Sequence, residues 1–385
     1  MHIVQVNYAY DPSLADPDEL LDRYATLTGW AETLLEAGAS RSSVVQRFGC
    51  DADRVRHGVA YCFRRSGAAS TAVWDRAQRL ADAVAMLKPD VIHVNGLSFP
   101  VPTMILRRTL PDCALVVQDH ADPLVRHLLR QAVLRRSLRG ADAVLFAAAP
   151  LARAWRERGL IAGNLPVYEV MESSTALRPL PKAAARQQTG MDGHPALLWV
   201  ARLNANKDPL TVLDAVELAA RDLPDLTLTM VGHDGDDRDR VRTRIAGSPT
   251  LAPRVRQIGM VPHQELAAYF SAADLFVSGS HHEGSGYAVL EAIACGVVPV
   301  VTDIPTFRVM TVNGRLGRLW PPGDARALAL ALKDLATTDR ASLEIALADH
   351  FRERLSWRAI GRAAIGVYRD VLRKKRPRRL SSVSP

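Results

Sequence analysis

The chain has no long apolar run. No segment reaches the ~18–20 continuous apolar residues that a membrane-spanning helix needs. The first twenty residues include several acidic side chains and lack the apolar core of a secretory signal peptide. We therefore expect a cytoplasmic protein.

Cysteine is scarce as well. No two of the cysteines are spaced like a zinc knuckle or a redox CxxC pair. In a reducing compartment such residues are expected to be free thiols. They are Cys50, Cys62, Cys113 and Cys295.

Acidic residues are outnumbered by basic ones. The formal net charge is +8, and part of the excess lies in one basic run at residues 373–379. A surface of this sign attracts nucleic acid, anionic lipid or phosphorylated substrates. No RRM, KH or zinc-finger pattern accompanies it, so we expect no nucleic-acid partner and interpret residues 376–385 as a solvated basic tail.

The 385 residues are too many for one ordinary core, so two domains are expected. Short runs rich in Val, Ile and Leu alternate with amphipathic stretches in both halves, and a Ser-, Pro- and Gly-containing stretch at 172–195 resembles a linker. Such alternation indicates parallel sheets covered on both faces. We predict an α/β fold of two Rossmann-like, doubly wound domains over residues 1–180 and 190–355.

The strongest local signal is a pair of glutamates eight residues apart. Glu283 follows the apolar strand 273–277 and begins a glycine-containing loop, and the helix predicted over 287–295 carries Glu291. A helix start offers free N–H groups and a positive end, which suit a phosphate. Eight helical residues rise ~12 Å, so the two carboxylates can hold two hydroxyl-bearing parts of one long ligand.

Two cations form the second signal. Arg202 and Lys207 lie in the turn between the first strand of the second domain and the following helix. Ligands of doubly wound sheets bind at this edge. Arginine grips phosphate bidentately, and lysine acts as a compact point charge.

Together these residues resemble the family-4 retaining glycosyltransferases, also described as glycosyl transferases group 1. Glu283 and Glu291 match the E-x7-E motif of that family, and Arg202-Leu203 with Lys207 resembles its donor-phosphate motif. The resemblance is strong over about residues 196–335 and weaker over the first half, which implies an acceptor-binding domain over 1–180 and a domain that binds the nucleotide-sugar donor over 190–355. It implies the GT-B fold, in which two Rossmann-like domains face each other across a cleft. It also implies a C-terminal helix that crosses back to the first domain, expected here at 356–375.

The resemblance further implies roles in binding a nucleotide-diphosphate sugar, such as a UDP-, GDP- or ADP-sugar. Arg202 and Lys207 would neutralise the diphosphate, Glu283 would contact the sugar and Glu291 the ribose. Backbone groups of the loop before the helix would surround the phosphates, and the turn after the strand at 255–258 would lie near the base. The remaining expected donor-binding residues are Gly259, Val261, Gly284, Ser285, Gly286 and Tyr287.

Two histidines follow strands of the first half. His120 lies just after the strand 115–118, where the family often has a histidine near the transferred sugar, so we expect it to be catalytic. We interpret His93 as a core residue.

No convincing carboxylate metal site accompanies these motifs. Asp51-Ala52-Asp53 has the Asp-x-Asp spacing but lies in a poorly matching loop, which we interpret as a solvated turn. We therefore expect transfer without a metal or other cofactor, to an acceptor hydroxyl that the sequence does not identify.

Two alternatives stay open. A sugar-nucleotide epimerase of the same fold, or a non-catalytic sugar-nucleotide-binding protein, would have the same phosphate-binding residues. Independently, residues 124–139 combine five arginines with leucine and valine, as in a helix that lies on anionic lipid. We hypothesise a peripheral contact with the inner membrane face through this helix, against the simpler interpretation that it packs on its own sheet.

Overall fold

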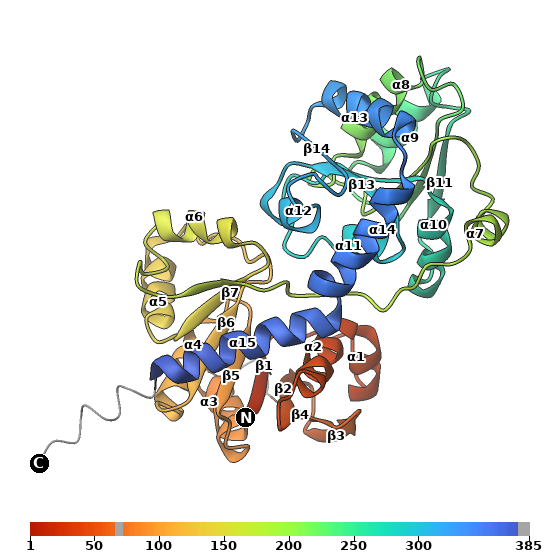
Figure 1. The fold of residues 1–385 in the computed structure, drawn as a ribbon. Helices are drawn as coiled ribbons and strands as arrows, with labels where there is room; N and C mark the ends of the chain where they lie inside the picture. The colour runs from red at the N-terminus through yellow and green to blue at the C-terminus, as the bar shows by residue number, and fades with distance from the viewer. Residues whose placement is uncertain (66–71, 376–385) are drawn as a thin grey trace, which may run out of the picture. The chain divides into compact units, whose positions relative to one another are not determined.

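The structure is a computed structural model that describes residues 1–65 and 72–375. The chain forms two compact units. Unit 1 consists of Met1–Ser173 and the C-terminal segment from Trp357, and unit 2 of Ser174–Ser356 (Figure 1). The division after Ser173 precedes the predicted boundary at residue 180, and the predicted basic tail at 376–385 lies outside the described residues.

Unit 1 is built on an eight-stranded sheet within the described residues, in the order β3-β4-β2-β1-β5-β6-β7-β8. All neighbours pair in parallel except β3 and β4, which form an antiparallel hairpin at one edge. The strands are β1 (His2–Asn7), β2 (Arg41–Phe48), β3 (Ala52–Arg56), β4 (Val59–Arg65), β5 (Val91–Asn95), β6 (Ala114–Gln118), β7 (Ala143–Phe146) and β8 (Val167–Glu169).

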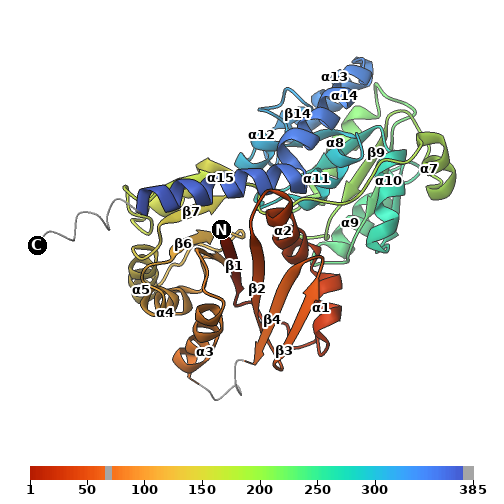
Figure 2. The same cartoon turned by 60° about the horizontal axis from the view of Figure 1, so that its bottom comes forward.

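Helices cover both faces of this sheet (Figure 2). One core contains alternate strand residues such as Val4 and Val6 with side chains of α3, α4 and α5, and a second core joins α1 and α2 to β2 and β4. The helices are α1 (Pro17–Arg23), α2 (Ala25–Glu36), α3 (Val73–Met86), α4 (Pro100–Thr109), α5 (Leu128–Leu138), η1 (Ala149–Leu151), α6 (Ala152–Glu157) and α15 (Trp357–Lys375).

Unit 2 has a fully parallel six-stranded sheet in the order β11-β10-β9-β12-β13-β14. Counted within the unit, this is the 3-2-1-4-5-6 order of the Rossmann fold. The predicted α/β class with two doubly wound sheets is therefore confirmed. The strands are β9 (Ala196–Val200), β10 (Thr227–Val231), β11 (Val255–Gly259), β12 (Leu275–Ser278), β13 (Val298–Thr302) and β14 (Arg318–Trp320).

One helix of unit 2 precedes its first strand, those from α8 to α12 connect consecutive strands, and the last three follow β14. The helices are α7 (Lys182–Thr189), α8 (Pro209–Ala219), α9 (Arg238–Ala246), η2 (His263–Glu265), α10 (Leu266–Ala272), α11 (Tyr287–Ala294), α12 (Pro305–Met310), α13 (Ala325–Thr337), α14 (Ala341–His350) and η3 (Phe351–Leu355). None of the helices in the described ranges is long and apolar enough to cross a membrane.

The stretch expected to be a linker contains the division between the two units after Ser173, but its later part forms the helix α7. Buried Asp274, just before β12, accepts hydrogen bonds from Lys182 (2.5 Å) and Arg186 (2.9 Å) of this helix and from the Ala196 N–H (2.8 Å). Burial alone would raise the pKa of Asp274, but these donors hold it below its ordinary value. The carboxylate thus fixes α7 to the start of the parallel sheet.

The C-terminal helix α15 returns to unit 1 and lies beside α2 (Figure 1), as the resemblance implied. The Thr33 hydroxyl donates to the Trp357 carbonyl at 2.7 Å. Further along α15, the buried Tyr368 hydroxyl lies 2.5 Å from Nδ1 of His93 on β5. The helix therefore completes the face of the sheet that α2 covers only in part.

Close packing of α15 on α2 leads to a stability prediction. A Cβ at Gly361 would lie 2.6 Å from the Thr33 carbonyl oxygen, so Gly361→Ala must push the helices apart. We expect it to lower the free energy of unfolding by about 1–3 kcal/mol, the usual cost of overpacking.

Gly366→Ala is the matched control on the same helix. It is exposed, and a Cβ there meets no atom within 4 Å. It should stabilise the protein by about 0.5–1 kcal/mol through helix propensity. Denaturant melts of both variants measure the difference, and equal effects would contradict the packing described for Gly361.

Candidate functional site

The predicted donor residues of unit 2 gather where its strand order reverses. Strands β9 and β12 are neighbours, but their crossovers run to opposite sides of the sheet. At such a switch point the loops after the two strands part and leave a crevice for a ligand. Arg202 and Lys207 lie in the loop after β9, and Glu283 lies in the loop after β12.

Hydrogen bonds join the two loops. The Asn206 backbone carbonyl accepts from the His281 N–H at 2.8 Å. The side-chain amide of Asn206 donates to the His282 carbonyl and accepts from the His282 N–H, both at 3.1 Å. Asp208 caps α8 through the Thr211 N–H while its other oxygen lies 3.1 Å from Nε2 of His281. Asp208 has φ +44°, a conformation that costs energy in a non-glycine residue and that these bonds stabilise.

Lys207 and Glu283 form an ion pair across the switch point. Both side chains are largely buried, and the Glu283 carbonyl also accepts from the Thr306 hydroxyl at 2.9 Å. Arg202 is exposed, and its guanidinium has no partner in the part of the chain that the structure describes. One neutralised cation and one free cation therefore lie beside the same crevice.

Helix α11 begins directly after this loop, as the sequence predicted. Its N-cap is Gly286 at φ +59°, and a Cβ there would lie 2.6 Å from the Phe307 ring. Of the loop residues before the helix, Gly284 and Ser285 are buried, whereas Tyr287 in its first turn is 44% exposed.

Glu291 is buried on α11, and its carboxylate lies 2.5 Å from Nε2 of His263 in η2. This hydrogen bond raises the pKa of His263 above its ordinary value, against partial burial of the ring. The histidine side chain is otherwise exposed. No sequence motif indicates this partner for the carboxylate expected to bind ribose.

A cavity of about 200 Å³ lies at the carboxyl ends of β10 and β11. Gly259, expected near the base, lines it and has open space at its Cβ position, whereas the partly buried Val261 is not among the lining residues. The loop after β10 is tightly packed at Gly232, since a Cβ there would overlap the Ala201 carbonyl oxygen. The absence of a side chain at Gly232 therefore lets the main chain of this loop lie against the loop that carries Arg202.

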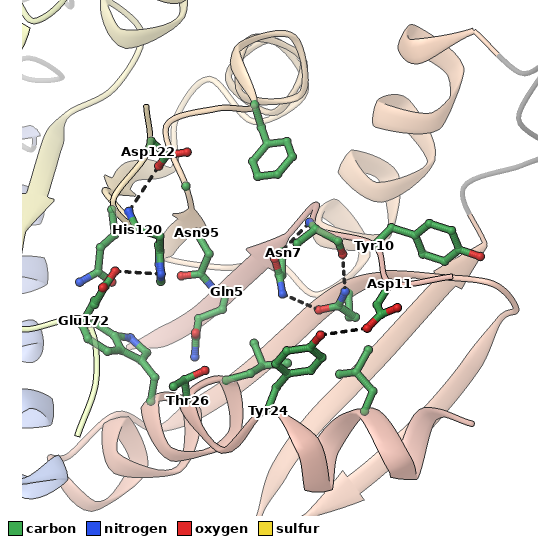
Figure 3. Close-up of a pocket in the computed structure, with 18 residues that line it drawn as sticks. Gln5, Asn7, Tyr10, Asp11, Tyr24, Thr26, Asn95, His120, Asp122 and Glu172 are labelled. Carbon is green, nitrogen blue, oxygen red and sulfur yellow. Dashed lines mark hydrogen bonds and ion pairs between the residues drawn. The ribbon is translucent and has the colours of Figure 1, made fainter. Parts of the chain in front are cut away.

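Unit 1 has a cavity of about 330 Å³ at its own switch point, where β1 separates β2 from β5 (Figure 3). Its wall includes residues at the carboxyl ends of four strands: Asn7, Gln46, Asn95 and Gln118. His120, the catalytic candidate, lines the same cavity.

Nδ1 of His120 lies 3.0 Å from the carboxylate of Glu172, which is buried. Burial would lower the pKa of His120, but the hydrogen bond and charge of Glu172 outweigh it and raise the pKa. The neighbouring Asp119 is buried beside Asp122, and its pKa rises to about 7, mainly through desolvation. Asp122 also anchors the opposite loop, because it accepts from the Leu97 N–H at 2.7 Å.

His93 lies in the core and not on this cavity. It is fully buried, packs against Trp30 and Tyr368, and has its pKa lowered to about 3 by desolvation. It joins the sheet to α2 and α15.

Several residues around these sites were not predicted from the sequence. Glu172 was assigned to a linker, and His263 carried no motif. The carboxamides Gln5, Asn7, Asn95 and Gln118 were read only as parts of strands or loops, although three of them end a strand. Among the described residues no three His, Cys, Asp or Glu side chains are grouped closely enough to hold a metal ion.

The family described as glycosyl transferases group 1 matches residues 181–353, which include every predicted donor residue. This match assigns residues 181–353 to the group 1 glycosyltransferases. The predicted family is confirmed, and the protein is an enzyme that transfers sugar from a nucleotide donor.

Individual relatives agree with this membership. Glycogen synthase of Mycobacterium tuberculosis is 29% identical over 303 residues, covering 75% of this chain and 70% of the relative. The GDP-mannose:cellobiosyl-diphosphopolyprenol alpha-mannosyltransferase of Xanthomonas oryzae pv. oryzae is 26% identical, covering 80% and 81%. Anabaena HepE, solved with UDP and glucose, superposes with a TM-score of 0.69 at 18% identity, covering 96% of this glycosyltransferase and 100% of that chain. The last similarity shows the GT-B fold.

The ion pair between His263 and Glu291 leads to a pH prediction. Because the pKa of His263 is raised, the pair stabilises the folded state fully below the ordinary value of 6.5 and loses this effect as the pH rises through the raised value. Glu291→Gln should lower the pKa of His263 toward 6.5 and remove this pH dependence.

An NMR titration of the imidazole C–H signals measures the shift. Glu265→Gln is the control, because it removes a nearby carboxylate that makes no side-chain hydrogen bond with His263 in the described structure. A pKa of His263 that stays the same in Glu291→Gln would contradict the assignment.

Proposed function

We propose that the enzyme transfers a hexosyl group from a nucleotide-diphosphate sugar to an acceptor hydroxyl with retention of anomeric configuration and without a metal ion. The observation that carries this proposal is the cation pair at the switch point of unit 2. Among the described residues Arg202 has no partner and Lys207 is paired only with Glu283, a residue that the proposal assigns to the sugar.

Breaking the bond between sugar and phosphate develops positive charge on the sugar and negative charge on the departing diphosphate. Preorganised cations beside the diphosphate stabilise this charge separation. In the proposal the Lys207 ammonium leaves Glu283 and pairs with the diphosphate, and Arg202 binds a second phosphate oxygen. Glu283 is then free to accept hydrogen bonds from the hydroxyls of the donor sugar.

The remaining donor contacts follow the same edge of the sheet. The loop from Gly284 to Gly286 and the first turn of α11 at Tyr287 would offer N–H groups to the phosphates. Glu291 would leave His263 to bind the ribose, and Gly259 with Val261 would lie near the base. UDP-, GDP- and ADP-sugars all fit this description, and two similar proteins are named or solved with GDP-mannose and UDP.

On the acceptor side His120 is proposed to contact the transferred sugar. Glu172 holds Nδ1, which orients the ring and leaves Nε2 available to a ligand. This arrangement resembles other histidines whose orientation a buried carboxylate fixes.

The decisive test is Lys207→Ala. Removing one preorganised group should reduce kcat by about 10²–10³, because the leaving diphosphate loses its counter-charge. Turnover of labelled UDP-, GDP- and ADP-sugars, with excess EDTA present, measures transfer and metal independence together. Wild-type turnover in the variant would refute the assignment, and activity restored only by Mn²⁺ or Mg²⁺ would refute metal independence.

Lys333→Ala is the matched control. Lys333 is also paired with a carboxylate of unit 2, Asp222, but on the surface of the unit. Exposed pairs contribute little, so this variant should keep wild-type turnover. Product analysis in the same assay would show a changed sugar configuration without transfer if the enzyme were instead an epimerase.

We also propose a peripheral contact with anionic membrane through α5. Leu134 and Leu138 are buried in unit 1, so the predicted amphipathic helix does pack on its own sheet. The start of the helix is different, because Leu128 and Leu129 are 78% and 73% exposed between the exposed Arg126 and Arg130. Exposed leucines flanked by arginines are typical of segments that lie on lipid.

Co-sedimentation with liposomes tests this contact. The double variant Leu128→Ser, Leu129→Ser should bind vesicles with anionic lipid less than wild type, and binding should fall with salt. Leu330→Ser, at a leucine of unit 2 that is 65% exposed, should bind like wild type. Equal binding to neutral and anionic vesicles would contradict the proposal.

A further inference from the structure

The cavity of unit 1 is lined by a row of carboxamides. Gln46, Asn7, Asn95 and Gln118 are direct neighbours in the register of four adjacent parallel strands, from β2 through β1 and β5 to β6. They lie at the carboxyl edge of the sheet, where doubly wound folds bind ligands. Gln5 lies two residues before Asn7 on β1, deeper in the same cavity (Figure 3).

Part of this row is already engaged. The Asn7 amide donates to Gln46 at 2.7 Å, and Gln46 donates to the Ala9 carbonyl at 2.9 Å. These bonds hold the loop after β1 and use up much of the hydrogen-bonding capacity of both side chains. Asn7 and Gln46 therefore shape the wall of the cavity.

Gln5 is different. Its side chain is 1% exposed, yet neither its amide nitrogen nor its amide oxygen has a hydrogen-bond partner within the described residues. Burying such a group without partners costs free energy, so native proteins seldom keep one unless something binds it. Gln5 lines the cavity, which places both a donor and an acceptor at its floor.

The charges of the lining residues limit what can enter. Asp11, Asp122 and Glu172 line the cavity, and none of the described lining residues is Lys or Arg. The guanidinium of Arg47 lies 4.9 Å from the centre of the Tyr10 ring, but it lines a separate cavity together with Arg76. His120 also lines the cavity, but its charge is matched by Glu172, so Asp11 and Asp122 would repel a phosphate ester and would not repel an uncharged hydroxyl.

We propose that the acceptor group entering this cavity is an uncharged sugar or polyol ring, bound through its hydroxyls by Gln5 and by the Gln118 side-chain oxygen, which also has no partner among the described residues. Each hydroxyl both donates and accepts, which matches the paired donor and acceptor of a carboxamide. The half-exposed rings of Tyr10 and Tyr24 offer apolar surfaces to its C–H groups. This inference rests on the proposed transfer function and names the acceptor class for it.

The test uses full-length enzyme and two variants. Gln5→Met keeps the length of the side chain and removes its polar atoms. It breaks no hydrogen bond of the described structure, so the melting temperature without ligand should stay the same or rise. Ser42→Ala is the control, because Ser42 also has a buried, unpartnered hydroxyl on β2 but does not line the cavity.

Saturation-transfer NMR compares glucose and myo-inositol with glucose 6-phosphate and inositol 1-phosphate, each in the presence of UDP or GDP. The neutral probes should bind, and the phosphate esters should bind about tenfold more weakly or not at all. Gln5→Met should weaken binding of the neutral probes by about tenfold, the loss expected for one buried hydrogen bond, and Ser42→Ala should not change it. Asn95→Ala provides a second cavity variant should Gln5→Met fail to fold.

Preferred binding of the phosphate esters, or unchanged binding of neutral probes in both cavity variants, would overturn the inference. Failure of the transfer function itself is visible separately. In that case the wild-type enzyme consumes no nucleotide sugar with any acceptor, whichever probes bind to unit 1.

Discussion

The parallel pairing of β9 with β12 is the constraint on which the donor site depends. Parallel neighbours bring their carboxyl ends to one edge of the sheet, and the reversal of strand order there keeps helices from covering it. Two loops that are some 75 residues apart in the chain are thereby forced together, and Asn206 joins them through backbone bonds to His281 and His282. The ion pair between Lys207 and Glu283 follows from this geometry.

The two units use the same topological position for opposite chemistry. At the switch point of unit 2 the cation Arg202 has no partner in residues 1–65 and 72–375, as suits a phosphate-bearing ligand. At the switch point of unit 1 the wall carries carboxamides and carboxylates, with His120 held by Glu172. A single fold can serve both purposes because the strands set only the position of the loops, and the side chains decide which ligand is bound.

The sequence was informative wherever a pattern is local. Buried strands such as β5 and β9 are continuous apolar runs, and the donor motif lies in two short loops. Strand β3 escaped notice because it is a polar edge strand, and α7 because Pro and Gly flank it while its anchor, Asp274, is distant in the chain. At the start of α3 the apolar side chains of Val73 and Trp74 are 47% and 52% exposed, so an apolar residue at helical spacing is not always a core residue.

The acceptor-side residues were beyond a single-sequence argument for a related reason. Gln5, Asn95 and Gln118 come from three strands, and none has a motif of its own. Only the register that aligns Asn7 with Asn95 and Asn95 with Gln118 makes them one surface. His263 likewise could be recognised as a site residue only from its contact with Glu291, which lies 28 residues away in the chain.

The return of α15 to unit 1 has a consequence for synthesis on the ribosome. Unit 2 is one continuous segment and can fold once residue 356 has emerged, whereas unit 1 needs both ends of the chain. Until Trp357 and Tyr368 are made, Thr33 and His93 lack their partners and one face of the first sheet stays uncovered. Residues 1–173 therefore complete their folding only after unit 2 has been made, and a chain truncated before α15 would keep an intact unit 2 and an unfinished unit 1.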